Sequence, residues 1–418
     1  MEKPNTRIFK ILAEIVFSDL QRIFPQILFV GAAGGVIGLL YLEMLSLLGK
    51  WLSPDARLPW EQVLVMAGIG LLIAILIKVL GNPGNVELLV NNIHLLGGQS
   101  EFKNLRSLIP VSLLCIASGG AAGPEAPLVQ TSGSFGTWVA LKKNFSKEDI
   151  RILTITGMAA GFTVLFGAPL GSAIFALEIL HRRGLEYHEA LLPAILGSMC
   201  GYILCAFAAG LHLTPEWNFP VASSISRPDL AWAVAAGIVA AAVAMAFTYL
   251  NIGLRKAFHI FPTFSRPIIG GILLGLLGLW SSYALTYGEG QIGSVVVLQV
   301  SAGALAVIAA AKFLGTSMTI SSGWRGGFII PLFFVGMTLA KLWHNLLPST
   351  NEIMLISALM AATNTGVTKT PIGSTIVVTE MAGLRILPTT LIACIITLLL
   401  TSEVGLIESQ QRRDDLSH

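Results

Sequence analysis

The sequence predicts an all-α polytopic membrane protein built from two related halves, and three observations support this fold class. The 418 residues are 54% hydrophobic and only 12% charged, whereas soluble domains carry about a quarter charged residues. The apolar residues are gathered into long blocks, and two groups of short motifs occur twice in the same order. A soluble protein with a large core would need charged faces that this chain lacks.

Apolar blocks near the roughly 17–25 residues that cross a bilayer mark the predicted membrane-spanning helices. These blocks are 27–48, 63–80, 191–209, 230–250, 268–285 and 295–314, with a shorter one at 386–400. Residues 1–26 mix charged and apolar residues at helical spacing, which predicts an amphipathic helix at the membrane surface rather than a cleavable signal. Basic clusters in short connections, such as those at 142–151 and 182–183, indicate cytoplasmic segments.

The composition also argues against several classes of function. The four cysteines lie in apolar blocks without metal-ligand spacing, so we expect neither a metal site nor disulfides. The net charge of +3 is too small to indicate nucleic-acid binding. The seven histidines are scattered and form no catalytic cluster with Ser or Cys, so we expect no enzymatic activity and no cofactor. A membrane-embedded enzyme, or a sensor that carries no flux, remains the alternative from another class.

Two matched blocks indicate an internal duplication. Residues 118–127 (SGGAAGPEAP) match residues 322–331 (SGWRGGFIIP), and residues 168–178 (APLGSAIFALE) match residues 370–380 (TPIGSTIVVTE). We therefore predict one membrane domain over 1–418, with repeats at about 27–215 and 225–405. The match alone does not give their relative orientation, but inverted repeats are common in secondary transporters, where the ion site lies between the halves.

The first matched pair indicates an anion site. Each block is a Gly- and Pro-rich opening followed by a short apolar run, at 128–141 and at 332–343. A helix that begins inside the membrane leaves its first N–H groups unpaired and carries partial positive charge there. An anion can satisfy those groups, and glycine permits its close approach to the backbone. The alternative is that both openings are kinks for helix packing.

Three carboxylates stand out within the apolar blocks. Glu125 lies in the first opening itself, and a carboxylate at bilayer depth is costly and usually functional. It could occupy the anion site as a tethered ligand and leave when protonated, which would couple anions to protons. The alternative for Glu125 is a charge that only satisfies a helix N-terminus. Glu178 and Glu380 close the second pair of blocks, where a charge at the membrane interface is the stronger interpretation.

Together these motifs resemble the CLC family of chloride channels and proton-coupled anion antiporters over nearly the full length of the chain. Residues 123–127 (GPEAP) resemble the family's GREGP motif, with its gating glutamate at Glu125. Residues 327–331 (GFIIP) resemble GxFxP, with Phe328 one place early, and residues 168–178 resemble the APLxGxxFxxE helix. The resemblance implies a CLC-type fold of two inverted-topology repeats with broken and re-entrant helices, in a homodimer with one pathway per subunit.

The departures from the family pattern point to a particular branch. Residues 81–85 (GNPGN) stand where the family has GSGIP, so Asn82 replaces the serine that contacts chloride. Ile407 stands at the position of the family's anion-contacting tyrosine, and Ile179 at that of the inner proton glutamate. This combination resembles the bacterial fluoride/proton antiporters of the family. An amide offers fluoride two donors where serine offers one.

The resemblance implies a fluoride-exporting, proton-coupled antiporter in the cell inner membrane, with fluoride or chloride and protons as its transported partners. A chloride/proton antiporter or a passive chloride channel of the same family remains the alternative. Glu125 is the expected gating and proton-coupling residue, with Glu178, Thr365 and Thr368 as candidate parts of a proton path. The expected anion-binding residues are Gly81, Asn82, Gly123, Gly327, Phe328, Ile329 and Ile330. The chain ends soon after its last apolar block, so we expect no C-terminal nucleotide-binding domains.

Overall fold

The computed structural model of the chain describes residues 4–54, 57–84, 102–181, 187–209, 217, 219–220, 224–407 and 410, with only the backbone over 4–20. The described part is helical, and its one isolated β-bridge is antiparallel and joins Gly123 to Gly327. Eight of the described helices are long and apolar enough to cross a membrane. The predicted all-α, multi-pass membrane fold is therefore confirmed.

The helices follow one another without any sheet between them in the described residues. They are α1 (Pro4–Leu52), α2 (Pro59–Leu80), α4 (Phe102–Ala117), α5 (Glu125–Lys142), α6 (Lys147–Phe166), α7 (Pro169–Glu178), α8 (Leu191–Ala209), α9 (Arg227–His259), α10 (Arg266–Trp280), α11 (Glu289–Val297), α12 (Ala302–Ser321), α13 (Ile329–Leu346), α14 (Glu352–Thr368), α15 (Pro371–Ala382) and α16 (Leu387–Thr401). Short 3₁₀ turns lie at η2 (His188–Ala190), η3 (Ser282–Ala284) and η4 (Leu384–Ile386).

Several predicted spans differ from the observed helices. The predicted span 295–314 is wrong, because α11 ends at Val297 and α12 begins at Ala302. The Ser301 hydroxyl accepts the N–H of Ala304 at 3.3 Å and so starts a new helix within the apolar run. The predicted span 268–285 is too long, since α10 ends at Trp280. The run 332–343 is part of α13, whose 18 residues are long enough to cross a membrane.

The sequence analysis did not predict α6 as a membrane span, although α6 is the most enclosed candidate span of the described chain. Of its apolar window, 94% is buried inside the protein. Its start is a capping box, in which the Ser146 hydroxyl accepts the N–H of Asp149 and the Asp149 carboxylate accepts the N–H of Ser146. The charges of this first turn hid the helix from a search for uninterrupted apolar residues.

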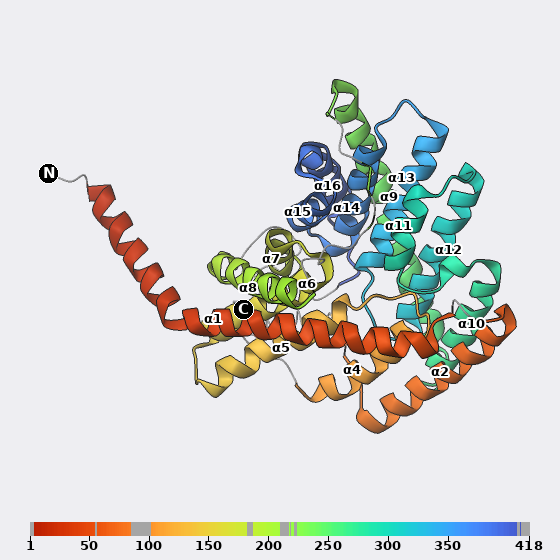
Figure 1. Cartoon of the computed structure of the whole chain (residues 1–418), viewed down its shortest axis with the longest axis horizontal. Coiled ribbons are helices and arrows are strands. Elements are labelled where there is room, and N and C mark those ends of the chain that lie inside the picture. Colours follow the sequence, from red (N-terminus) through yellow and green to blue (C-terminus); the bar gives the residue numbers. More distant parts are fainter. Residues whose placement is uncertain are drawn as a thin grey trace.

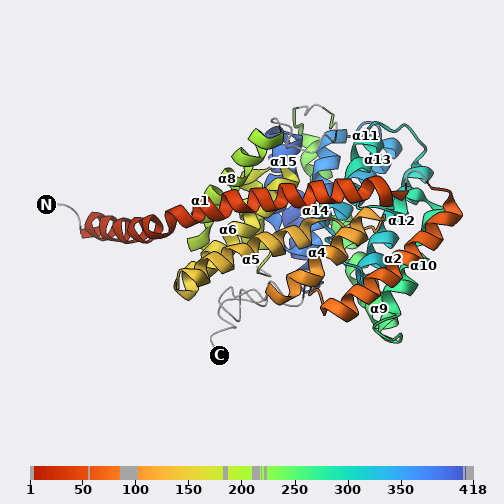
Figure 2. The same ribbon diagram turned by 60° about the horizontal axis from the view of Figure 1, so that its bottom comes forward.

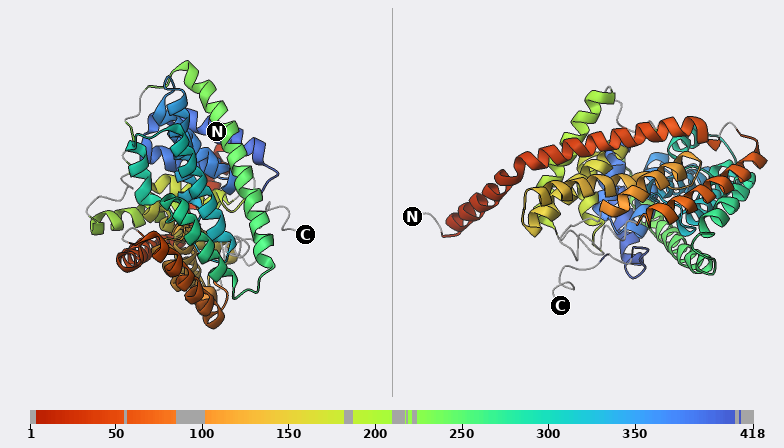
Figure 3. Two further views of the ribbon diagram at one scale, coloured as in Figure 1. Left: turned by 90° about the vertical axis from the view of Figure 1, so that its right-hand side faces the viewer. Right: turned by 90° about the horizontal axis from the view of Figure 1, so that it is seen from below.

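The long helix α1 joins the predicted surface helix to the first predicted span without a break from Pro4 onward. Its first part projects away from the bundle, and its later part lies across the outside of the other helices (Figures 1 and 2). The expected position of residues 1–26 at a membrane surface stays a prediction. On another side, α9 runs as a long helix along one edge of the molecule (Figure 3).

The two halves meet through pairs of equivalent helices. At the end of α7, the carboxylate of Glu178 accepts the N–H groups of Ile372 at 3.2 Å and Gly373 at 2.6 Å, at the start of α15. In return, Glu380 of α15 accepts the N–H of Gly171 at 2.9 Å, at the start of α7. Each helix thus caps the other, which requires the two to run antiparallel. This exchange agrees with the inverted sense expected from the resemblance.

Glycine makes this close pairing of α7 and α15 feasible. A Cβ at Gly373 would lie 2.6 Å from the Cα of Phe175, and one at Gly171 would lie 2.5 Å from the backbone nitrogen of Val377. Both contacts are with backbone, which cannot move aside as a flexible side chain could. The repeated glycine of the two motifs is therefore a requirement of the interface between the halves.

Candidate functional site

The helices α5 and α13 both begin in the interior of the protein, where the two halves meet. Just before these helices, Gly123 and Gly327 exchange backbone hydrogen bonds of 2.8 and 2.6 Å. This pair of equivalent glycines brings the start of α5 against the start of α13. Two helix N-termini, each with unpaired N–H groups and partial positive charge, thus face one small region.

The side chain of Glu125, at the start of α5, lies in this region. It is only 1% exposed, and its Oε1 accepts the N–H of Ile330 at 2.5 Å, in the first turn of α13. Its Oε2 is buried without a hydrogen-bond partner among the described residues. A Cβ added at Gly123 or at Gly327 would collide with this Oε2. The carboxylate therefore rests on the two glycines and occupies a position at a helix N-terminus that suits an anion.

The neighbouring residues at the start of α13 divide between the core and a cavity. Ile329 and Ile330 are buried, at 5% and 1% exposure. Phe328 packs against Phe247, with ring centroids 6.2 Å apart, and lines a cavity of about 260 Å³. The structure thus brings together Glu125, Gly123, Gly327 and the start of α13, as the sequence analysis expected of the site.

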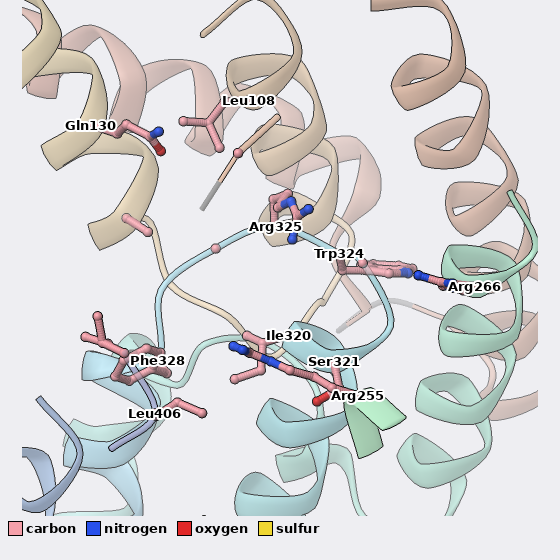
Figure 4. Close-up of a pocket in the computed structure, with 15 residues that line it drawn as sticks. Leu108, Gln130, Arg255, Arg266, Ile320, Ser321, Trp324, Arg325, Phe328 and Leu406 are labelled. Carbon is pink, nitrogen blue, oxygen red and sulfur yellow. The ribbon is translucent and has the colours of Figure 1, made fainter. Parts of the chain in front are cut away.

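The cavity carries a group of arginines that sequence reasoning missed. Arg255, Arg266 and Arg325 reach it from α9, α10 and the segment before α13 (Figure 4). The sequence could have indicated Arg325, because it stands in the repeated block where the first half has Ala121. No sequence pattern indicates Arg255 or Arg266, because only the fold brings the end of α9 and the start of α10 to the same cavity. Three cationic side chains around one cavity favour the accumulation of anions there.

Asn82 lies beside this cavity rather than against Glu125. It is exposed and follows α2, and its Oδ1 accepts the N–H of Gly84 at 3.2 Å and an N–H of Arg325 at 3.4 Å. Gly84 and Ile407 both line the cavity. Gly81 has a φ of +96°, in the left-handed region that favours glycine, and ends α2. Asn85 of the same motif lies outside the described residues.

Glu178 is not an exposed charge at the end of a helix, and its expected position at the membrane interface stays a prediction. The residue is 1% exposed, and two backbone N–H groups of α15 satisfy its carboxylate. The sequence could not reveal this, because the partner lies almost 200 residues further along the chain. Glu380, the equivalent residue, is only partly buried.

A hydroxyl network surrounds the other candidate proton-path residues. The hydroxyl of Thr368 lies 2.6 Å from that of Thr370, which lies 2.8 Å from the hydroxyl of Ser374. The Thr365 hydroxyl donates to the carbonyls of Ala361 at 2.9 Å and Thr370 at 3.3 Å. All of these residues are buried.

Gln410 ties this network to the position where the family has its inner glutamate. Its side-chain nitrogen donates to the carbonyls of Thr368 at 2.7 Å and Ile179 at 2.9 Å. Gln410 is 4% exposed. Sequence reasoning missed this residue, which follows the last helix in a polar stretch that gave no sign of burial.

Paired inverted repeats, helix starts that converge within the molecule and a carboxylate lying on them define a multi-pass membrane transport protein of the anion-conducting type. Residues 84–402 match the family described as voltage gated chloride channel. Because this match covers most of the chain, the protein belongs to that family, the CLC family.

Known relatives and solved structures agree with this assignment. The chain is 25% identical over 401 residues to the chloride/fluoride channel protein of Pseudomonas syringae pv. tomato, across 91% of this chain and 84% of that protein. It is 28% identical over 284 residues to an uncharacterised protein of Methanocaldococcus jannaschii, across 67% of this chain and 70% of that one. It is 26% identical over 300 residues to the voltage-gated ClC-type chloride channel ClcB of Citrobacter koseri, across 69% of this chain and 71% of that one.

Two solved structures share the fold. A CLC-type fluoride/proton antiporter superposes with a TM-score of 0.84 at 21% identity, over 94% of this chain and 99% of that one. A slow cyanobacterial Cl⁻/H⁺ antiporter superposes with a TM-score of 0.75 at 20% identity, over 90% and 93%. The expected CLC-type fold of inverted repeats is confirmed, and the family assignment makes the protein an anion transporter or channel.

Proposed function

We propose that this protein is an antiporter that exports fluoride in exchange for protons, with Glu125 as its gating and proton-coupling carboxylate. The observation that carries the proposal is the place of that carboxylate. It lies buried on the amide of Ile330, at the α13 N-terminus where a transported anion would bind.

Coupling follows from competition for this amide. The ionised carboxylate accepts the N–H of Ile330 and rests on Gly123 and Gly327, so it excludes an anion from the same place. A proton taken up by Glu125 removes its negative charge and weakens its bond to the amide and its attraction to the helix N-terminus. An anion then displaces it. When the anion leaves, the carboxylate returns and its proton is released.

Selectivity for fluoride is supported by the side chains beside the cavity. The Asn82 oxygen is held by Gly84 and Arg325, and its amide carries two N–H donors for a strongly hydrated, hydrogen-bond-accepting ion. Ile407 lines the cavity where a chloride transporter of the family would have a tyrosine hydroxyl. A relative is described as a chloride/fluoride channel protein, and a structural neighbour as a fluoride/proton antiporter.

Movement of protons on the cavity side is proposed to use the buried hydroxyl network. Thr365 and Thr368 belong to it, and Gln410 joins it to the backbone of Ile179. Glu178 serves mainly to hold α15, since its carboxylate already accepts two backbone N–H groups. We further propose a homodimer with one pathway per subunit, placed in the cell inner membrane.

A passive channel or a chloride/proton antiporter is the second candidate. Ile179 supports the passive channel, because an aliphatic side chain cannot carry protons as the family's inner glutamate does. The similarity to the chloride channel ClcB supports chloride as the transported ion. Anion efflux from liposomes that hold the purified protein separates the candidates. The proposal expects fluoride to leave faster than chloride, and an imposed proton gradient to drive fluoride uphill. Fluoride flux that an imposed proton gradient cannot drive would favour the channel.

A further inference from the structure

A second group of polar residues lies on the side of Glu125 away from the cavity. It consists of Tyr287 and Glu289, at the start of α11, and the buried Lys312 of α12. Helix α10 starts at Arg266, which lines the cavity, and its 15 residues carry the chain about 22 Å away before η3 and Tyr287 follow. We call the segment 285–291 the distal segment, because it lies at this far end.

The distal segment is fixed firmly against the helices of the site. The ammonium of Lys312 donates to the carbonyls of Leu285 and Thr286, both at 2.7 Å, and to the side-chain oxygen of Gln291 at 2.9 Å. Lys312 is fully buried and lies 5.0 Å from the ring centre of Phe334. One buried cation therefore ties the backbone between η3 and α11 to the first turn of α11.

Two contacts place the distal segment next to Glu125. The N–H of Thr286 donates to the carbonyl of Gly119 at 2.8 Å, in the loop that leads into α5. Gly288 packs on Phe334, since a Cβ there would lie 3.1 Å from its ring. Phe334 is one helical turn, about 6 Å, from Ile330, which binds Glu125.

Glu289 is suited to exchange protons with water. It is partly buried, its neighbour Gly290 is exposed, and the Tyr287 hydroxyl donates a short hydrogen bond to its Oε2. The unpartnered Oε2 of Glu125 provides an acceptor on the inner side. A hydrogen-bonded pair of groups that can bind protons therefore lies beside the exposed Gly290, on the segment that packs next to the helices of the gating carboxylate.

We propose that Glu289 and Tyr287 form the relay that loads Glu125 with protons from the side opposite the cavity. Glu289 takes a proton from water. Tyr287 passes its hydroxyl proton through one water to Glu125 and takes the proton of Glu289 in its place. Tyr287 stays neutral, Glu125 becomes a carboxylic acid, and Glu289 is again a carboxylate that reloads from water. This role deepens the proposed antiport and rests on it.

Other titratable groups face the same region from neighbouring elements, and they set the controls. Tyr41 of α1 shares a 2.8 Å hydrogen bond with Ser112 of α4. Cys115 of α4 is also buried. Beyond α11, the ammonium of Lys341 binds the carbonyl of Val296 and the carboxylate of Glu352. Tyr41→Phe also removes one buried tyrosine hydroxyl from this region but leaves Glu289 and its hydrogen bond intact, so it serves as the matched control for Tyr287→Phe.

The test is a two-sided recording of anion and proton flux across a planar bilayer, with pH fixed on the cavity side and varied on the distal side. For Glu289→Gln we expect flux to become half-maximal at a distal-side pH about one unit lower than in the wild type. This shift equals a roughly tenfold loss of proton affinity. Removing a negative neighbour and a proton donor makes Glu125 harder to protonate, so more acid is needed. Tyr287→Phe should shift it in the same direction, and the double variant should shift it no further than Glu289→Gln alone.

Two outcomes would overturn the relay, and they differ from failure of the antiport itself. A Glu289→Gln profile that matches wild type, or one that Glu43→Gln on the exposed face of α1 reproduces, removes Glu289 from the proton path. Additive shifts in the double variant would mean that Tyr287 and Glu289 do not act as one unit. If the wild-type protein moves no protons at all, both the antiport and the relay are rejected together, whereas coupled wild-type flux with unaltered variants rejects the relay alone.

Discussion

The reciprocal capping of α7 and α15 gives a prediction with an internal control. In Glu178→Ala, the N–H groups of Ile372 and Gly373 lose their buried acceptor. An unsatisfied buried donor costs about 1–3 kcal/mol, so the two together destabilise the protein by about 2–6 kcal/mol. The favourable interaction of the carboxylate with the α15 N-terminus, about 0.3–2 kcal/mol, is lost as well.

The equivalent substitution Glu380→Ala is the matched control. It removes the acceptor of the Gly171 N–H, but Glu380 is only partly buried, so water can replace it. We expect a loss near 1 kcal/mol, the net value of an ordinary hydrogen bond. Glu178→Gln keeps one acceptor oxygen and should fall between the two.

The assay is unfolding of the purified variants in one detergent, followed by tryptophan fluorescence against denaturant concentration. Glu178→Ala should unfold at clearly lower denaturant than Glu380→Ala. If Glu380→Ala is as destabilising as Glu178→Ala, the two buried hydrogen bonds to α15 are not what gives Glu178 its structural role. If Glu178→Gln keeps its stability but stops proton movement, Glu178 belongs to the proton path instead.

Two further predictions concern the site itself. Asn82→Ser replaces an amide by a hydroxyl, so chloride flux in liposomes should rise relative to fluoride flux; an unchanged ratio would show that selectivity lies elsewhere. Gly327→Ala places a methyl group where the Glu125 carboxylate rests, so the carboxylate should be displaced and anion leak without a proton gradient should increase. If a folded Gly327→Ala protein leaks anions only at the wild-type level, the position of the Glu125 carboxylate against Gly327 does not block the anion path.

Much of the site could be predicted because the duplication doubles each local signal. Gly123 and Gly327 were expected from a repeated block, and the structure pairs them directly. Glu125 was expected from a single carboxylate in a Gly- and Pro-rich opening, and it lies on the amide of Ile330. These features are local in sequence, since helix starts and close backbone approaches demand particular residues.

The features that could not be predicted depend on contacts between distant residues. Glu178 looked like a helix-ending surface charge, yet its partners are 194 and 195 residues away. Arg255 and Gln410 follow apolar stretches and gave no sign of a shared site. The break before α12 depends on one serine within an apolar run, where hydrophobicity alone does not distinguish one span from two short helices.

The central claim is that Glu125 couples protons to anions, and the most direct test is to record proton movement during fluoride efflux from liposomes. Glu125→Gln keeps the shape of the side chain and removes its titration, with Glu43→Gln as the control for a lost surface carboxylate. The account predicts that Glu125→Gln abolishes proton movement while Glu43→Gln retains it. Proton movement at the wild-type level in Glu125→Gln would contradict the account and place the coupling carboxylate elsewhere in the chain.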